Sequence, residues 1–181
     1  MSGTNRLAEL FRERAVRLGH FTLASGKTST FYIDCKQVLF CPEALALIAD
    51  QFLDRIASWN VQAVGGLEVG AIPLAAAVVL RSQQRGTPLE GFFVRKATKD
   101  HGSQQRLEGR LPPGCRVAIV EDVITTGGSS EQAIEVVQQA GHTVAGLVCL
   151  VDRGQGGRER FSSRFGFEAL LGSTDLGLPT S

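Results

Sequence analysis

The stretch that decides the fold is Val117-Ala118-Ile119-Val120-Glu121-Asp122-Val123-Ile124-Thr125-Thr126-Gly127-Gly128-Ser129-Ser130. Its apolar, β-branched start, residues 117–120, is typical of a buried parallel strand. The strand pattern stops at two carboxylates, and a turn rich in hydroxyls and glycines follows. From Glu131 onward the apolar residues have helical spacing. The stretch therefore predicts a strand, a polar turn and a helix, with the turn at the start of the helix.

A turn in this position suits a phosphorylated sugar. The N–H groups at a helix start carry the positive end of the helix dipole and bind phosphate, and Gly127 and Gly128 let the backbone approach an anion closely. Glu121 and Asp122, at the carboxyl end of the strand, are placed to accept hydrogen bonds from a ribose diol. The alternative is that Asp or Thr only caps the helix, but capping needs one such residue and this turn holds several. The turn lacks the Gly-Lys-Ser/Thr ending of a P-loop.

Composition describes one domain of ordinary size. The chain has 181 residues, of which 43% are hydrophobic, enough for a core without disulfides. Its 19 Lys and Arg nearly balance its 18 Asp and Glu, so no general attraction to nucleic acid or membrane is expected. The four cysteines form no C-x-x-C pair, and the N-terminus has no signal-peptide pattern. We therefore expect a single cytoplasmic domain over 1–181, with neither nucleic acid nor membrane as a partner.

Helical and strand patterns alternate along most of the chain. An amphipathic helix over 7–18 opens it, with Gly19 as the stop, and a short strand follows at 31–34. A second helix begins at Pro42. Further segments follow in the order strand 61–67, helix 72–81, strand 91–94, strand 117–120, helix 132–139 and strand 144–151. This order predicts an α/β fold with a doubly wound, mostly parallel sheet that binds ligands at the carboxyl ends of its strands.

A long basic segment without apolar periodicity, residues 94–109, lies between two of these strands. A loop of this length in a compact domain is usually functional. Its cations suit an anionic leaving group, and its polarity and Gly102 suit a lid that orders on binding. The alternative is a solvated basic hairpin. The cations are Arg95, Lys96, Lys99 and His101.

Three other segments lie where ligands are expected. Residues 65–75 form a glycine-bounded turn between a strand and a helix; its N–H groups can bind an anion, or it is only a tight turn. Arg153 follows a strand at the edge that carries the acidic turn, where a bidentate donor matches a carboxylate, unless it forms a surface salt bridge. Residues 21–34 combine a turn, a cation and aromatics, of which Phe21 is the better candidate for the core.

Two of these motifs resemble those of a known family. The acidic turn resembles the phosphoribosyl pyrophosphate (PRPP) site of type I phosphoribosyltransferases. The pattern Arg-Lys-x-x-Lys-x-His-Gly followed by Glu-Gly resembles the catalytic loop of orotate phosphoribosyltransferases, and the similarity runs from about Phe21 through Arg153. The resemblance implies the type I phosphoribosyltransferase fold, with a small N-terminal hood (roughly 1–40 plus a C-terminal segment), a core (roughly 41–155) and a flexible catalytic loop.

The same resemblance implies the reaction. The 5-phosphoribosyl group of PRPP is transferred to orotate, giving orotidine 5'-monophosphate and pyrophosphate, in pyrimidine nucleotide synthesis. The resemblance implies Mg²⁺ as cofactor, held mainly by PRPP and water with no direct protein ligand. It also implies a homodimer in which the catalytic loop of one subunit closes over the site of its partner, with Lys99 and His101 reaching across.

The resemblance also assigns residues. Catalytic roles fall to Lys99, His101 and Asp122. Binding of PRPP falls to Arg95, Lys96, Lys99, His101, Glu121, Asp122, Val123, Ile124, Thr125, Thr126, Gly127, Gly128 and Ser129. Binding of orotate falls to Lys27, Phe31, Tyr32, Thr125 and Arg153. The chain departs from some members, which carry Lys where Gly70 and Ala24 stand; Lys27 is the candidate substitute for the second.

Two other functions remain open at this point. One is another type I phosphoribosyltransferase, acting on a purine or on uracil. The other is a non-catalytic regulator of the same fold that senses a ligand and binds RNA, DNA or a partner. Arg153 and the pattern of the basic loop favour orotate, whereas the balanced net charge and the lack of a nucleic-acid module argue against the regulator.

Overall fold

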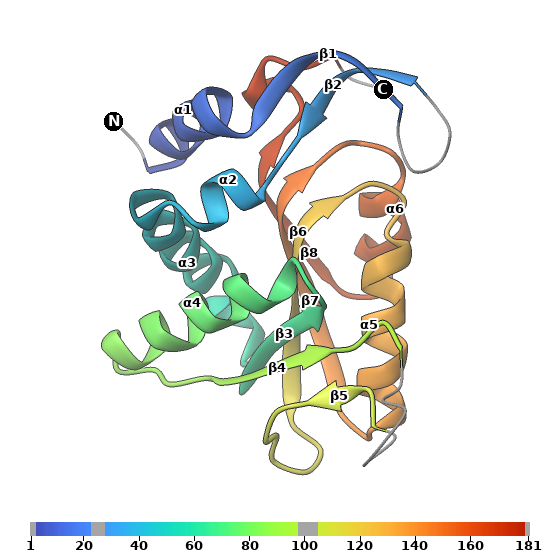
Figure 1. Ribbon diagram of the computed structural model, residues 1–181. Helices are drawn as coiled ribbons and strands as arrows, with labels where there is room; N and C mark the ends of the chain where they lie inside the picture. Colours follow the sequence, from blue (N-terminus) through green and yellow to red (C-terminus); the bar gives the residue numbers. More distant parts are fainter. Residues whose placement is uncertain (1–2, 23–27, 98–104, 180–181) are drawn as a thin grey trace.

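A six-stranded sheet forms the centre of the molecule, with strand order β5-β4-β3-β6-β7-β8 (Figure 1). The computed structural model describes residues 3–22, 28–97 and 105–179. Neighbouring strands pair in parallel, except that β5 runs antiparallel to β4. The strands are β3 (Ala63–Leu67), β4 (Glu90–Val94), β5 (Leu107–Glu108), β6 (Arg116–Ile124), β7 (Thr143–Asp152) and β8 (Gly166–Gly172). The predicted α/β class with a mostly parallel sheet is confirmed.

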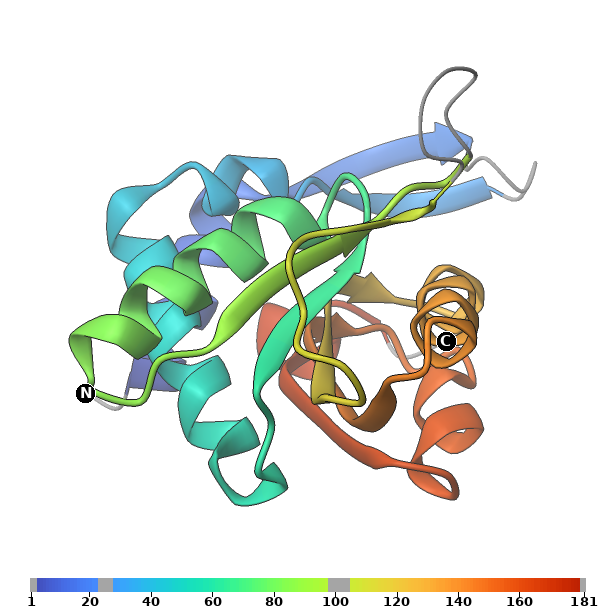
Figure 2. The same ribbon diagram turned by 90° about the horizontal axis from the view of Figure 1, so that it is seen from below.

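Helices cover both faces of this sheet, as the two views show (Figures 1 and 2). One face carries α1, α2, α3 and α4, and the other carries α5 and α6. The sheet is therefore doubly wound. The helices are α1 (Gly3–Arg14), α2 (Lys36–Leu39), α3 (Pro42–Ile56), α4 (Ala71–Gln84), α5 (Gly128–Gln139) and α6 (Gly157–Ser162), with short 3-10 turns η1 (Ala57–Trp59) and η2 (Thr174–Leu176).

Strand β6 joins the two hydrophobic cores. Ala118 and Val120 belong to the core beneath α3 and α4, whereas Val117 and Ile119 belong to the core beneath α5 and α6. Successive side chains of a strand point to opposite faces, so a strand covered on both faces needs an unbroken apolar run. The run 117–120 is fully buried for this reason.

The strand β6 is longer than the sequence predicts. It was expected to stop at Val120, but its pairing with β7 continues as far as Ile124 opposite Asp152. Glu121 and Asp122 therefore lie inside the strand and not after it. Because β7 pairs with β6 as far as Ile124, the polar side chains of Glu121 and Asp122 do not end the strand. Helix α5 likewise begins at Gly128, ahead of the predicted start at residue 132.

The predicted opening helix over 7–18 is wrong at its C-terminal end. Helix α1 ends at Arg14, and β1 (Val16–Thr22) pairs antiparallel with β2 (Thr28–Ile33). Leu18 fits the helical spacing but lies in β1, where its side chain is 79% exposed. The backbone groups of 16–22 are paired by a separate strand, β2, which local periodicity does not reveal. No helix in the described part of the chain is long and apolar enough to span a membrane.

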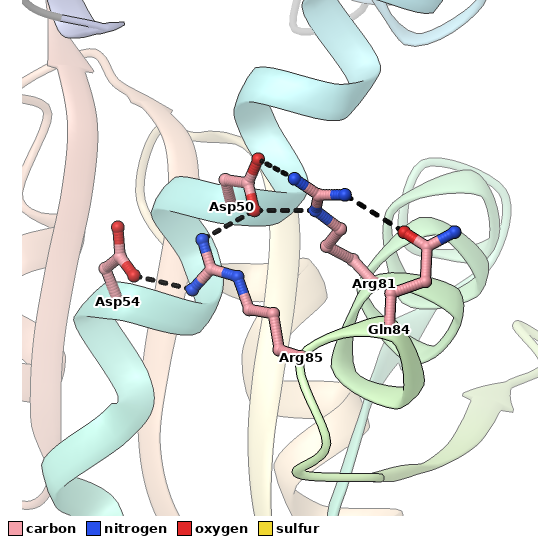
Figure 3. Close-up of polar contacts among 5 residues, drawn as sticks. All are labelled: Asp50, Asp54, Arg81, Gln84 and Arg85. Carbon is pink, nitrogen blue, oxygen red and sulfur yellow. Dashed lines mark hydrogen bonds and ion pairs between the residues drawn. The ribbon is translucent and has the colours of Figure 1, made fainter.

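An ion-pair network ties α3 to α4 on the surface (Figure 3). The guanidinium of Arg81 binds both carboxylate oxygens of Asp50, at 2.7 and 2.9 Å. Arg85 binds the same carboxylate and also that of Asp54, at 2.6 Å. The network fixes α4, which begins at the turn after β3, against the longer helix α3.

We predict that the contribution of Asp50 to stability depends on pH. The hydrogen bond from Arg81 lowers the pKa of the Asp50 carboxyl in the folded protein. A depressed carboxyl pKa stabilises the fold above its unfolded value, about 4, and this contribution is lost as the pH falls through the folded pKa. Asp50→Asn should therefore lower the free energy of unfolding by about 1 kcal/mol at pH 7 and by progressively less towards pH 3.

Urea unfolding at both pH values measures this difference. Asp54→Asn is the matched control, because its more exposed carboxylate bonds only Arg85 among the described contacts and should cost less. An equal loss from Asp50→Asn at pH 7 and pH 3 would show that the effect is not electrostatic.

Candidate active site

The predicted site residues gather at the carboxyl edge of the sheet. The turn after β3 carries residues 68–70, the segment after β4 carries 95–97, the turn after β6 carries 125–128, and Arg153 follows β7. The hairpin β1–β2 lies at the same edge, because Phe31 of β2 contacts Arg153. Segments far apart in the sequence are thus brought together at one place.

The turn after β6 leaves the start of α5 open. The N-cap residue Gly127 has a φ of +81°, a left-handed conformation that favours glycine, and no side chain caps the helix. Gly128 and Ser129 are exposed, and a Cβ built on Gly128 would meet no atom within 4 Å. The first N–H groups of α5 therefore face solvent, as a phosphate site requires.

The two carboxylates of β6 lie in different surroundings. Glu121 is buried on the α5 side, where the Ser130 hydroxyl donates a hydrogen bond to it at 2.9 Å. Burial, and next the charge of Asp122, raise the pKa of Glu121 to about 8. Asp122 is half-buried and accepts a hydrogen bond from its neighbour, the Val123 N–H, at 2.8 Å. One acid is largely protonated at neutral pH, and the other is accessible.

The carboxylate of Asp122 lies directly against the turn after β3. A Cβ built on Gly70 would stand 2.6 Å from the Asp122 carboxyl carbon and 2.7 Å from both of its oxygens. Position 70 therefore has no room for a side chain while Asp122 keeps this place. Helix α4 begins at the next residue, and no side chain caps it. Its open N-terminus is a second place for an anion at the same edge.

Glu68 connects this turn to the basic segment. Its N–H donates to the Val94 carbonyl at 2.8 Å, and its carboxylate accepts a hydrogen bond from the Lys96 N–H at 2.9 Å. The peptide bond between Glu68 and Val69 is cis. Glu68 is the acid of the turn 65–75 and was not among the predicted site residues.

The basic segment begins and ends in a paired stem. The Arg95 N–H donates to the Arg106 carbonyl, and the Arg106 Nε donates to the Arg95 carbonyl, each at 2.8 Å. Residues 107–108 then form β5 against β4, so the expected loop over 94–109 is structured at both described ends. Lys96 is exposed. Lys99 and His101 lie outside the described residues.

Arg153 and Phe31 come together, whereas Tyr32 lies apart from them. The Arg153 guanidinium carbon lies 4.9 Å from the centre of the buried Phe31 ring. Tyr32, on the other side of strand β2, is 41% exposed and its ring centre lies 5.7 Å from that of Phe21. A pocket of about 480 Å³ adjoins Arg153 at the ends of β7 and β8. Lys27 lies outside the described residues.

Helix α6, which begins at Gly157 and was not among the predicted elements, supports the phosphate turn from behind. Its Arg160, and Arg164 in the turn that follows it, both bind Glu131 in the first turn of α5. The repeated Arg and Phe positions in 158–165 were the available signal. Ser130, the partner of Glu121, was also left out of the predicted site.

Metal ligands are sparse at this edge. Within 3–22, 28–97 and 105–179, no group of three or more His, Cys, Asp or Glu side chains is arranged to hold a metal ion. The four cysteines are free and buried.

Comparison with known proteins identifies the family. The model of the phosphoribosyl transferase domain matches residues 35–171. The orotate phosphoribosyltransferase of Sorangium cellulosum is 47% identical over 161 residues, which are 87% of this chain and 84% of that protein. The crystal structure of Mycobacterium tuberculosis orotate phosphoribosyltransferase in complex with Fe(III) dicitrate superposes with a TM-score of 0.87 at 38% identity, covering 97% of this chain and 99% of that one.

A second crystal structure of the Mycobacterium tuberculosis enzyme, in complex with PRPP, gives a TM-score of 0.82 at 34% identity, again over 97% of this chain and 99% of that one. The match extends over the sheet, its helices and the turns that form the site edge. This chain contains a phosphoribosyl transferase domain and belongs to the orotate phosphoribosyltransferase family.

Proposed function

We propose that this protein transfers the 5-phosphoribosyl group from PRPP to orotate, giving orotidine 5'-monophosphate and pyrophosphate, a step of pyrimidine nucleotide synthesis. The observation that carries the proposal is the meeting of three features at one sheet edge. They are the open start of α5, the acidic pair of β6, and Arg153 against Phe31. The helix start matches a phosphate, and the acidic pair matches a ribose diol. Arg153 and Phe31 together match a flat ring that carries a carboxylate.

The donor lies across the turns after β6 and β3. Its 5'-phosphate binds the N–H groups of residues 125–129, and its ribose hydroxyls bind Glu121 and Asp122. Its pyrophosphate lies at the start of α4, with Arg95 and Lys96 beside it. Displacement at the anomeric carbon builds positive charge on the ribose, which the Asp122 carboxylate stabilises. Val123 and Ile124 contribute backbone at the end of β6.

The departing pyrophosphate needs positive charge. Lys99 and His101 of the catalytic loop supply it, and closure of the loop excludes water that would hydrolyse the donor. Mg²⁺ fits this site because its ligands would come from PRPP and water, and the Asp122 carboxylate between the two anion-binding turns would attract the ion without binding it directly. When bound, the ion offsets the charge of the pyrophosphate.

Orotate lies on the Phe31 side of the edge. The planar Arg153 guanidinium binds its carboxylate with two parallel hydrogen bonds, and Phe31 contacts its ring. Thr125 adds a polar contact near the base. Tyr32 and Lys27 complete the hood formed by residues 1–40 and the C-terminal segment. The carboxylate of the acceptor is thus the feature that separates orotate from uracil and the purines.

The enzyme acts as a cytoplasmic homodimer that shares its catalytic loops. Three apolar side chains on α4 and the turn before it support a dimer, because they are exposed on the surface. Val69 is 68% exposed, Ile72 38% and Leu80 63%. A partner covering them would place its own loop close to this site. Four buried, free thiols fit a reducing cytoplasm.

The orotate absorbance assay tests the reaction. Orotate should be consumed only when PRPP and magnesium are both present, and each should be omitted in turn. Uracil, adenine, guanine and hypoxanthine form the comparison panel. Consumption of one of these bases in place of orotate would support the other enzyme class. No turnover, together with RNA or DNA retained in filter binding, would support the regulator.

We predict that two inactive variants complement each other if the loops are shared. Lys99→Ala removes a cation of the loop, and Asp122→Asn removes a carboxylate of the site. A mixture refolded in equal amounts should recover about a quarter of wild-type activity, because half of the dimers are mixed and each carries one intact site. The assay is turnover of dimers whose composition is verified by mass. No recovery in verified mixed dimers would contradict sharing.

We also predict that Glu121 makes stability fall as the pH rises. Its folded pKa of about 8 lies above the ordinary carboxyl value, so its contribution is complete below about pH 4 and is lost as the pH rises through 8. Between pH 6 and 9 the free energy of unfolding of wild type should fall by about 2 kcal/mol more than that of Glu121→Gln.

Urea unfolding of the ligand-free protein measures this difference. Glu131→Gln is the control, since Arg164 lowers the pKa of Glu131 and this carboxylate does not titrate in the same range. Parallel pH profiles of wild type and Glu121→Gln would contradict a protonated Glu121.

A further inference from the structure

Helix α6 lies so close to the phosphate turn that neither backbone has room for an added Cβ. A Cβ on Gly127 would overlap the ring of Phe161, which is fully buried. A Cβ on Gly157 would stand 2.7 Å from the Thr125 carbonyl oxygen. The two segments therefore move together, and a change in α6 is transmitted to the turn.

Arg160 makes the polar contacts across this junction. Its Nη1 donates to the Thr126 carbonyl oxygen at 3.4 Å, and its Nε lies 3.0 Å from the Glu131 carboxylate. Its guanidinium carbon lies 5.9 Å from the centre of the Phe161 ring. The side chain thus bridges the turn itself and the first turn of the helix that follows it.

The contact with Thr126 has a direct effect on the anion site. In a planar trans peptide the C=O and the next N–H point to opposite sides. When Arg160 holds the Thr126 carbonyl on the α6 side, the Gly127 N–H must point away from α6. Without this contact the peptide is free to turn, and the carbonyl oxygen would then face the phosphate oxygens and repel them.

The charged side chains of this junction also favour phosphate binding at the start of α5. Glu131 stands in the first turn of α5, which favours the helix but repels an incoming phosphate. Arg164 binds both oxygens of this carboxylate, at 2.8 and 2.9 Å, and Arg160 binds one of them. Two cations therefore face one anion, and the start of α5 remains positive.

We propose that Arg160 is a positioning residue for the 5'-phosphate of the donor, which it serves by holding the Thr126–Gly127 peptide with its N–H toward the phosphate. This inference rests on the proposed function, in which residues 125–129 bind that phosphate. Arg160 does not touch substrate. It acts on the ribose-phosphate half of PRPP and not on the pyrophosphate half or on orotate.

Arg164, in the turn that follows α6, is a matched control. It carries the same charge and makes the shorter, bidentate contact with the same carboxylate, but its described side-chain hydrogen bonds reach only Glu131. Arg160→Leu and Arg164→Leu therefore remove equal charge from one junction. Only Arg160→Leu also removes a described hydrogen bond to the Thr126 carbonyl.

Binding of ribose 5-phosphate, measured by calorimetry, tests the phosphate half directly, and binding of pyrophosphate with magnesium tests the other half. Arg160→Leu should raise the Kd for ribose 5-phosphate and the KM for PRPP roughly fivefold, with the pyrophosphate Kd and the orotate KM unchanged. Arg160→Lys keeps the positive charge and a single donor nitrogen, so it should recover part of the lost ribose 5-phosphate binding. Arg164→Leu should lower the unfolding midpoint while leaving the ribose 5-phosphate Kd within about twofold.

Three results would overturn the inference: no change in ribose 5-phosphate binding by folded Arg160→Leu, an equal rise from Arg164→Leu, or an equal loss for pyrophosphate. Each is separable from failure of the proposed function. A wild-type protein that binds ribose 5-phosphate but does not consume orotate would refute the reaction, and the comparison of Arg160 with Arg164 would still test the turn.

Discussion

The ladder between β6 and β7 is the constraint on which the site depends. It continues past the apolar run to Ile124 opposite Asp152, and the Arg153 N–H then donates to the Ile124 carbonyl at 3.0 Å. One register therefore fixes the acidic pair, the phosphate turn and Arg153 relative to one another. A slip of one residue would move each of these side chains to the other face of the sheet. Backbone pairing thus sets the relative places of the proposed site residues.

The two neighbouring acids have different environments at this end of β6. Glu121, among the side chains beneath α5, keeps a proton and a hydrogen bond from Ser130. Asp122 faces the turn after β3 and remains open to solvent. Burying both as anions would cost several kcal/mol each, and exposing both would leave two like charges side by side. The net charge of +1 gives no overall field, so the attraction for a polyanionic donor must come from helix starts and a few local cations.

The sequence predicted those parts of the site that a single segment encodes. The strand at 117–120, the turn after it and the place of Arg153 follow from local pattern and strand polarity. Contacts between distant segments were not predictable: β1 depends on β2, and the junction of α6 with the phosphate turn depends on Phe161 and Gly127. Gly146 and Gly166 look like ordinary strand or loop glycines, yet the Trp59 ring lies where each Cβ would stand. No single-sequence signal pairs a tryptophan with two glycines that far away.

The close contact between Gly70 and the Asp122 carboxylate determines where the positive charge of the site must come from. The Asp122 carboxylate fills the space into which a side chain at position 70 would begin. A lysine there could enter only if Asp122 moved away from its proposed place at the ribose. The charge for the proposed pyrophosphate site must therefore come from the start of α4 and from the basic segment. Glu68 binds the Lys96 N–H, so the turn that lacks a cation is tied directly to the segment that supplies one.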